Sequence, residues 1–94
     1  MFPIARFRIS DSSMLPSFKG GDYVLVLKIY FSLKVGEVIV FERNGKFLIK
    51  RIERITNGKY FVIGDNRRLS KDSRHFGPIT KEHIIGKALI KIQK

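Results

Sequence analysis

A hydroxyl group able to act as a nucleophile is offered by a short polar run near the start of the chain. The run Asp11-Ser12-Ser13-Met14 follows directly on a predicted strand, and Pro16 restricts the backbone conformations open to Leu15. Serine hydroxyls are therefore expected on an exposed turn at the end of a rigid element. The same residue types also cap helical turns, so a structural interpretation stays open beside the catalytic one.

A base for such a nucleophile is offered by Lys50, which lies within the apolar run Phe47-Leu48-Ile49-Lys50-Arg51-Ile52. A lysine in a strand usually points outward into solvent. If Lys50 points inward instead, burial disfavours the ammonium form and lowers its pKa. A fall from about 10.4 to near 7 corresponds to roughly 4–5 kcal/mol. The neutral amine is then able to accept a proton from a serine hydroxyl.

A third polar segment extends from Gly64 to Gly77 and contains Ser70, Asp72 and Arg74. A loop of about fourteen residues without regular structure is long for so small a domain, and such loops tend to be functional. Its mixed charges and hydroxyls favour internal hydrogen bonds, with an ion pair available between Asp72 and Arg74. A purely structural loop of this composition remains an alternative.

Metal and cofactor chemistry finds little support in the composition. The chain has no cysteine, which excludes disulfides and thiolate metal sites. His75 and His83 are separated in sequence and no third ligand lies near them, so we interpret both as structural or surface residues. We expect neither a metal ion nor a cofactor.

The elements that must position these groups are mainly strands, because period-two alternation and β-branched residues dominate the sequence. Asn44-Gly45 and Asn57-Gly58 each predict a tight hairpin. A single helical turn is expected near residues 80–84. Strands are predicted at residues 4–9, 22–29, 37–42, 46–55, 59–63 and 87–92, with the second of these buried on both faces. We expect one domain spanning residues 1–94, built as a small closed or coiled β-barrel with little helix.

The charge of the chain favours contact with a polyanion. Nineteen Lys and Arg residues face eight Asp and Glu residues, which gives a net charge of +11. No run approaches the roughly 18 apolar residues that span a bilayer. We therefore expect a protein that is soluble or peripheral to an anionic membrane, with Phe2 or Tyr30-Phe31 dipping into the interface. A solvated basic surface without a partner remains the alternative.

In chain order, the polar runs and the strands between them resemble the sequence boxes of the signal peptidase I family. The resemblance covers about residues 7–92. It rests on Ser13-Met14-Leu15-Pro16, Gly21-Asp22-Tyr23-Val24, Gly36-Glu37-Val38-Ile39, Lys50-Arg51, Gly64-Asp65-Asn66-Arg67 with Ser70, Asp72-Ser73-Arg74 and Gly77, and Gly86-Lys87-Ala88. It implies a mainly β catalytic domain of the type shared with LexA proteins.

The resemblance also implies a serine endopeptidase with a Ser-Lys dyad, in which Ser13 attacks and Lys50 is the general base. Ser70 would orient the Lys50 amine, while Asp72 and Arg74 would hold the loop near the dyad. The substrates implied are precursor proteins or peptides, bound as an added β-strand and cut after small residues to remove a signal or leader. In length the chain is similar to small unanchored relatives that mature nickel-type superoxide dismutase.

The oxyanion site is the part of the resemblance from which this chain departs. The Ser13 backbone N–H would contribute to the oxyanion hole. Many family members carry Ser or Gly at the position of Asp11, whose carboxylate would repel an oxyanion. We therefore expect Asp11 to face outward, leaving Ser12 or backbone groups to assist.

Three rival interpretations remain. A self-cleaving LexA-type domain shares the fold and dyad, but the chain lacks the Ala-Gly pair that such proteins cut. A basic β-barrel that binds nucleic acid fits the composition. It leaves Ser13, Lys50 and the long loop unexplained, so we expect no nucleic-acid partner. A catalytically inactive relative is the third, with Asp11 as its main support.

Overall fold

The computed structural model describes residues 3–28 and 32–92, which form a six-stranded antiparallel sheet with short helical turns. The strands are β1 (Ile4–Arg8), β2 (Tyr23–Leu27), β3 (Val38–Arg43), β4 (Lys46–Thr56), β5 (Lys59–Ile63) and β6 (Ile84–Ile92). Between β5 and β6 lie a 3₁₀ turn (Arg67–Leu69), helix α1 (Ser73–Phe76) and a second 3₁₀ turn (Lys81–His83). The mainly β class predicted from the alternating pattern is confirmed.

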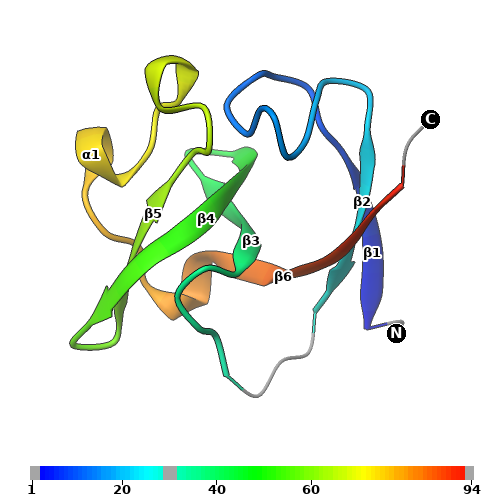
Figure 1. The fold of residues 1–94 in the computed structure, drawn as a ribbon. Coiled ribbons are helices and arrows are strands. Elements are labelled where there is room, and N and C mark those ends of the chain that lie inside the picture. Colours follow the sequence, from blue (N-terminus) through cyan, green and yellow to red (C-terminus); the bar gives the residue numbers. More distant parts are fainter. Residues whose placement is uncertain (1–2, 29–31, 93–94) are drawn as a thin grey trace.

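The last strand joins the two halves of the sheet, whose strand order is β1-β2-β6-β3-β4-β5 (Figure 1). Residues 84–87 of β6 pair with β3, and residues 87–92 pair with β2. The β1–β2 half and the β3–β5 half therefore depend on β6 for their relative position.

Both predicted hairpins are confirmed. Asn44 and Gly45 join β3 to β4 with φ angles of 52° and 77°. Asn57 and Gly58 join β4 to β5 with φ angles of 52° and 74°. Two successive residues with positive φ give the turn whose twist matches that of the flanking strands, and Asn-Gly tolerates this conformation best.

The sheet remains open, which corrects the expectation of a closed barrel. Within residues 3–28 and 32–92, β1 pairs only with β2, and β5 pairs with β4 and otherwise forms a single bridge between Tyr60 and Ile79. The residues of β4 before Arg51 pair only with β3 on one side. β1 and the first half of β4 instead approach through side chains, since the rings of Phe7 and Phe47 meet edge to face at 5.4 Å. A coiled, open sheet leaves two strand edges free of backbone partners.

The core explains why β3 is the strand buried on both faces. Ile39 and Phe41 pack with Ile52 of β4 and Val62 of β5 in one cluster. Val40, whose side chain projects to the opposite face, packs in a second cluster with residues of β2 and with Ile9. Residues 22–29 were expected to be the doubly buried strand. That expectation was wrong, because β2 alternates buried with half-buried residues.

Three further differences concern elements near the site. The segment from Gly64 to Gly77 contains a 3₁₀ turn and α1, although we expected no regular structure there. β6 starts at Ile84 instead of residue 87, directly after the 3₁₀ turn at Lys81–His83, which matches the expected helical turn. Phe2, Tyr30 and Phe31 lie outside the described residues. None of the described helices is long and apolar enough to cross a membrane.

Candidate active site

Ser13 lies in a tight turn that follows β1 and is held on two sides. Met14 is fully buried and anchors the turn, and its sulfur accepts a hydrogen bond from the Asp65 N–H at 3.3 Å. The Ser13 carbonyl accepts from the Asn66 N–H at 2.8 Å. Ser13 itself is only 2% exposed. Ser13 is therefore buried within a turn whose residues Asp11 and Ser12 are exposed as expected, and the turn is fixed to the segment that follows β5.

Lys50 projects from the middle of β4 on the same face as Leu48 and Ile52. Its side chain is buried, with 2% exposed, although a strand lysine usually reaches solvent. Burial lowers the pKa of Lys50; the carboxylates of Asp11 and Asp72 oppose this shift, and Arg74 adds to it. Among the described residues Lys50 makes no hydrogen bond or ion pair. A buried amine of this kind is easier to deprotonate than a surface lysine.

Asp11 does not face away from Ser13, which corrects our expectation. Its Oδ1 accepts hydrogen bonds from the Ser13 N–H and from the Ser13 hydroxyl, both at 3.1 Å. Aspartate commonly accepts a hydrogen bond from the N–H two residues later in the chain, so the spacing Asp-x-Ser was a local signal for this contact. The N–H expected to bind an oxyanion is thus already occupied by a carboxylate.

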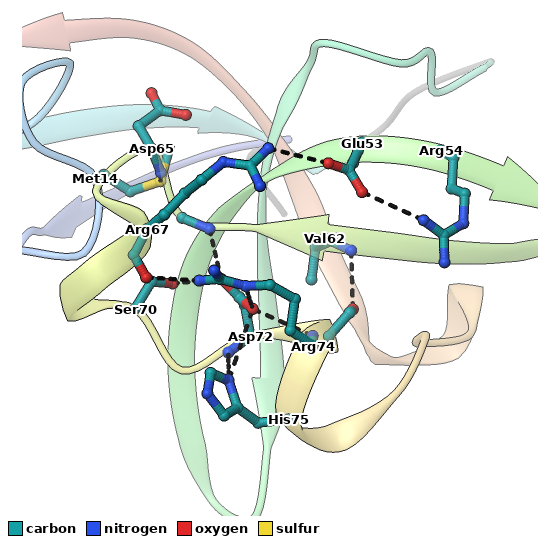
Figure 2. A network of polar contacts seen from close by, with 12 residues as sticks. Met14, Glu53, Arg54, Val62, Asp65, Arg67, Ser70, Asp72, Arg74 and His75 are labelled. Carbon is teal, nitrogen blue, oxygen red and sulfur yellow. Dashed lines mark hydrogen bonds and ion pairs between the residues drawn. The ribbon is translucent and has the colours of Figure 1, made fainter.

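Asp72 is the centre of the polar network that Figure 2 shows. Its fully buried carboxylate accepts from the Ser70 hydroxyl at 2.7 Å, from the Gly64 N–H at 2.9 Å and from Arg74 Nε at 2.9 Å. Burial would raise the pKa of Asp72, but hydrogen bonds from Arg74, Gly64 and Ser70 hold it well below its usual range. Asp72 also caps α1, because its side chain accepts from the Arg74 N–H.

Ser70 is turned toward Asp72 and donates its proton there. A hydrogen bond from Ser70 to Lys50, which the family resemblance implied, is not among the contacts of the described residues. Ser70 retains oxygen lone pairs with which it can accept a hydrogen bond. Its orienting role toward Lys50 stays a prediction.

Gly64 is the point where the serine turn and the Asp72 network meet. A Cβ atom added at Gly64 would lie 2.2 Å from Ser70 Oγ and 2.5 Å from the Ser13 carbonyl oxygen. Since no side chain fits between these groups, the Gly64 backbone packs directly against both. Ser13, Ser70 and Asp72 therefore belong to one cluster, and the charge of Asp72 also acts on Lys50.

The neighbour of Lys50, Arg51, fixes β4 to the same segment. Its guanidinium makes a two-pronged contact with Asp65, with Nε and NH2 each 2.8 Å from a carboxylate oxygen. Asp65 also accepts from the Ser17 hydroxyl at 2.6 Å, which links the serine turn to the pair. Sequence reasoning assigned no role to Arg51 or Ser17. Their placement depends on contacts between distant parts of the chain.

A surface pocket lies between β1 and β4 beside these groups. Its polar lining comes from Arg8, Ser10, Asp11 and Lys50. Apolar side chains from both strands and from the core, including Phe7, Ile9 and Phe47, complete the lining. The free edges of β1 and of the first half of β4 border the pocket.

The remaining residues singled out from the sequence lie outside this cluster or at its rim. Ser12 is exposed, and its carbonyl accepts from the Leu15 N–H and the Asn66 side chain. His75 is exposed and its Nδ1 accepts from the Asp72 N–H at 3.3 Å as part of the helix cap. His83 lies exposed in the second 3₁₀ turn. The described part of the chain holds no group of three or more His, Cys, Asp or Glu residues placed to bind a metal.

Comparison with known proteins gives partial matches. The sequence model of the family described as "Signal peptidase, peptidase S26" matches residues 52–92, a stretch that includes Ser70, Asp72 and Arg74 but neither Ser13 nor Lys50. "Signal peptidase I V" of Bacillus subtilis (strain 168) is 51% identical over 46 residues, which is 46% of this chain and 27% of the relative. "Signal peptidase IB" of Staphylococcus aureus (strain Mu50) is 61% identical over 33 residues, 35% of this chain and 17% of the relative. The chain thus spans about a quarter or less of the curated relatives that it matches.

Proposed function

The chain belongs to the signal peptidase I family, and on this premise we propose that it is a serine endopeptidase that removes signal or leader peptides with a Ser13–Lys50 dyad. The observation that carries the proposal is the burial of Lys50, which lowers its pKa and so favours the neutral amine, in a pocket shared with Asp11 of the turn that holds Ser13. A buried lysine without a partner among the described residues costs stability, and an enzyme has a reason to retain it.

In the acylation step, Ser13 Oγ forms a bond to the carbonyl carbon of the substrate while its proton passes to Lys50 Nζ. The tetrahedral intermediate then collapses and the C–N bond breaks. The leaving amine takes the proton from Lys50, so the amine product departs neutral and Lys50 is again a free base. Ser70 and Asp72 support this step, Ser70 by orienting the amine and Asp72, with Arg74, by fixing the loop.

In the deacylation step, a water molecule replaces the leaving amine. Lys50 accepts a proton from the water, whose oxygen attacks the acyl carbon, and the C–Oγ bond breaks. The proton returns from Lys50 to Ser13 Oγ, which releases the carboxylic acid product and restores the starting enzyme. The Ser13 N–H, with Ser12 or a neighbouring backbone group, stabilises the oxyanion formed in both steps once Asp11 has left it.

The substrate proposed is an extended peptide segment with small side chains before the cut. The free edges of β1 and of residues 46–50 in β4 offer backbone groups for pairing with such a segment. Phe7 and Phe47, whose rings meet at 5.4 Å, both line the pocket between these edges. Small side chains therefore fit where larger ones would collide with the apolar lining.

The test is cleavage of a peptide with an Ala-x-Ala site by the wild type and by Ser13→Ala and Lys50→Met, between pH 6 and 10. We expect the wild-type rate to rise with pH through one ionisation, because only the neutral Lys50 amine accepts the serine proton. Each variant should lose at least about 10²–10³-fold in kcat/KM.

Lys59→Met is the matched control, since Lys59 also lies in a strand but is exposed and belongs neither to the pocket lining nor to the proposed substrate-pairing edges. It should leave the cleavage rate unchanged. Lys50→Met should also raise the thermal midpoint near pH 7, because it removes a buried group that folding must desolvate. Equal cleavage by wild type and Lys50→Met would contradict the dyad.

A second candidate, an inactive relative that only binds peptides, is favoured by one contact. Asp11 accepts hydrogen bonds from both the hydroxyl and the N–H of Ser13, the two groups that the reaction would use. In that case the wild type should bind the Ala-x-Ala peptide without cutting it at any pH, and Ser13→Ala should bind equally well. Binding measured by fluorescence anisotropy beside the cleavage assay separates the two functions.

A further inference from the structure

The contact between Asp11 and Ser13 places a carboxylate on the two donors that the proposed reaction needs. Asp11 Oδ1 accepts from the Ser13 hydroxyl at 3.1 Å and from the Ser13 N–H at 3.1 Å. The hydroxyl proton therefore points toward Asp11 rather than toward Lys50. A substrate carbonyl that reaches for the same N–H must compete with Asp11 for it.

The charges around Lys50 give the same carboxylate a second effect. Asp11 and Arg8 reach the pocket from the β1 side, while Asp72 and Arg74 face Lys50 from the segment after β5. Arg74 is bound to Asp72, so its charge and that of Asp72 largely offset each other. Asp11 binds no cation within the described residues, and its charge stabilises the ammonium form of Lys50. In that form Lys50 is unable to accept the serine proton.

Asp11 is held by fewer contacts than Asp72, the other carboxylate of the site. Asp72 is fully buried and receives hydrogen bonds from Gly64, Ser70 and Arg74. Asp11 is exposed, and its hydrogen bonds within the described residues both go to Ser13, two residues away. Rotation of one side chain would carry its carboxylate into water, where its charge is well solvated.

We propose that Asp11 is a positioning residue that holds the active site in a resting state, keeping the hydroxyl and the N–H of Ser13 hydrogen-bonded until a substrate carbonyl displaces the carboxylate. This inference rests on the proposed endopeptidase function and deepens it. The displacement couples two events. When the carboxylate leaves, the Ser13 N–H becomes available to the oxyanion, and Lys50 loses the negative charge that favoured its protonated form.

The experiment compares the wild type with Asp11→Asn, Asp11→Ala and a control, Glu42→Gln. Asparagine keeps the shape and can still accept a hydrogen bond, but it carries no charge. Alanine removes both the charge and the acceptor. Glu42 is exposed on β3 and is absent from the pocket lining, so Glu42→Gln changes the net charge equally without touching the site.

Two readouts are expected to change together. Below the wild-type pH midpoint, kcat/KM for the Ala-x-Ala peptide should rise about tenfold or more in both Asp11 variants, as expected for release of a hydrogen bond to a charged group. The pH midpoint of the rate should move to lower pH in both variants and stay unchanged in Glu42→Gln. The NMR titration of the lysine ¹³Cε signals, with Lys50 assigned by its absence in Lys50→Met, should move in the same direction without any substrate.

The outcomes separate this inference from the proposed function. A lower or unchanged kcat/KM in Asp11→Asn and Asp11→Ala would overturn it, as would an unchanged Lys50 titration. If none of the proteins cuts the peptide, the endopeptidase proposal fails, and the titration alone decides whether Asp11 keeps Lys50 protonated. If one variant does not fold by circular dichroism, the other supplies the same comparison.

Discussion

Lys50 and Asp72 are both buried, and their surroundings favour opposite charge states of the two side chains. Asp72 receives hydrogen bonds from Arg74, Gly64 and Ser70, which keep it charged inside the fold. Lys50 has no hydrogen-bond partner among the described residues, and burial lowers its pKa. The charged form of Asp72 therefore stabilises the native state, whereas the charged form of Lys50 opposes it. Asp72 therefore stabilises the fold, whereas Lys50 is suited to proton transfer.

The prediction at this scale concerns acid stability. Asp72→Asn should lower the free energy of unfolding near pH 7 by about 3 kcal/mol, because it removes the charge that Arg74 and the buried donors stabilise. The folded pKa of Asp72 lies below its unfolded value of about 4. The charge of Asp72 thus contributes fully to the free energy of unfolding above the unfolded pKa, and this contribution is lost as the pH falls toward the folded pKa. Thermal melts should show the difference from wild type shrinking below about pH 4.

Glu53→Gln is the control for Asp72→Asn, since Glu53 forms ion pairs with Arg54 and Arg67 near the surface. It should change the thermal midpoint little at any pH. A gap between Asp72→Asn and wild type that stays constant down to pH 2 would show that the charge of Asp72 is not what stabilises the fold.

The elements meet at the end of β5, where the chain passes the turn that carries Ser13. Gly64 lies against Ser70 and the Ser13 carbonyl, and Asn66 donates to the same carbonyl. Asp65, which lies between Gly64 and Asn66 in the chain, binds Arg51 of β4. The Ser13 turn, β4 and the segment after β5 are thus fixed together, and their packing leaves no space for a side chain at Gly64. The position of the serine depends on this packing rather than on its own turn alone.

We predict that Gly64→Ala is destabilising and reduces cleavage, whereas Gly20→Ala is neutral. The added methyl at Gly64 would overlap Ser70 and the Ser13 carbonyl, at a cost of about 1–3 kcal/mol. At Gly20 nothing lies within 4 Å of the added methyl, and its φ is not positive. Chemical denaturation and the Ala-x-Ala cleavage assay check both variants. Equal stability of Gly64→Ala and Gly20→Ala would contradict the prediction, because it would mean that the neighbours of Gly64 can shift to accommodate a methyl group.

The whole molecule carries a net charge of +11, and its basic residues are spread over many elements. Several arginines lie over aromatic rings at the surface, among them Arg6 over Tyr23 at 4.7 Å and Arg54 over Phe61 at 3.8 Å. Such a surface attracts anionic lipid headgroups by long-range electrostatics. We propose that peripheral contact with an anionic membrane brings the protein to its substrates.

We predict that the protein co-sediments with vesicles of phosphatidylglycerol and phosphatidylcholine at low salt and is released at high salt. Each basic residue near the surface contributes about 1 kcal/mol to binding, and salt screens this attraction. Pure phosphatidylcholine vesicles are the control and should bind little. Binding that is insensitive to salt and to lipid charge would contradict an electrostatic contact.

Short-range chemistry in the sequence determined the strands and hairpins. Asn-Gly pairs set the positive φ angles at both hairpins, and period-two alternation located most strands to within a few residues. The polar runs also supplied Ser13, Ser70 and Asp72, which lie in one cluster, and an apolar run supplied Lys50, on which the charge of Asp72 acts. The Asp-x-Ser spacing held a signal for the contact of Asp11 with Ser13 that the sequence reading did not use.

Only the tertiary structure decided which of these groups are buried and which face one another. Lys50 is buried because β4 packs its face toward the core, and its charge neighbours Asp11 and Asp72 come from other segments. Whether the sheet closes depends on how β1 approaches β4, and there side chains of Phe7 and Phe47 meet in place of backbone groups. Burial and electrostatics depend on residues distant in sequence, so no local pattern in the sequence specifies them.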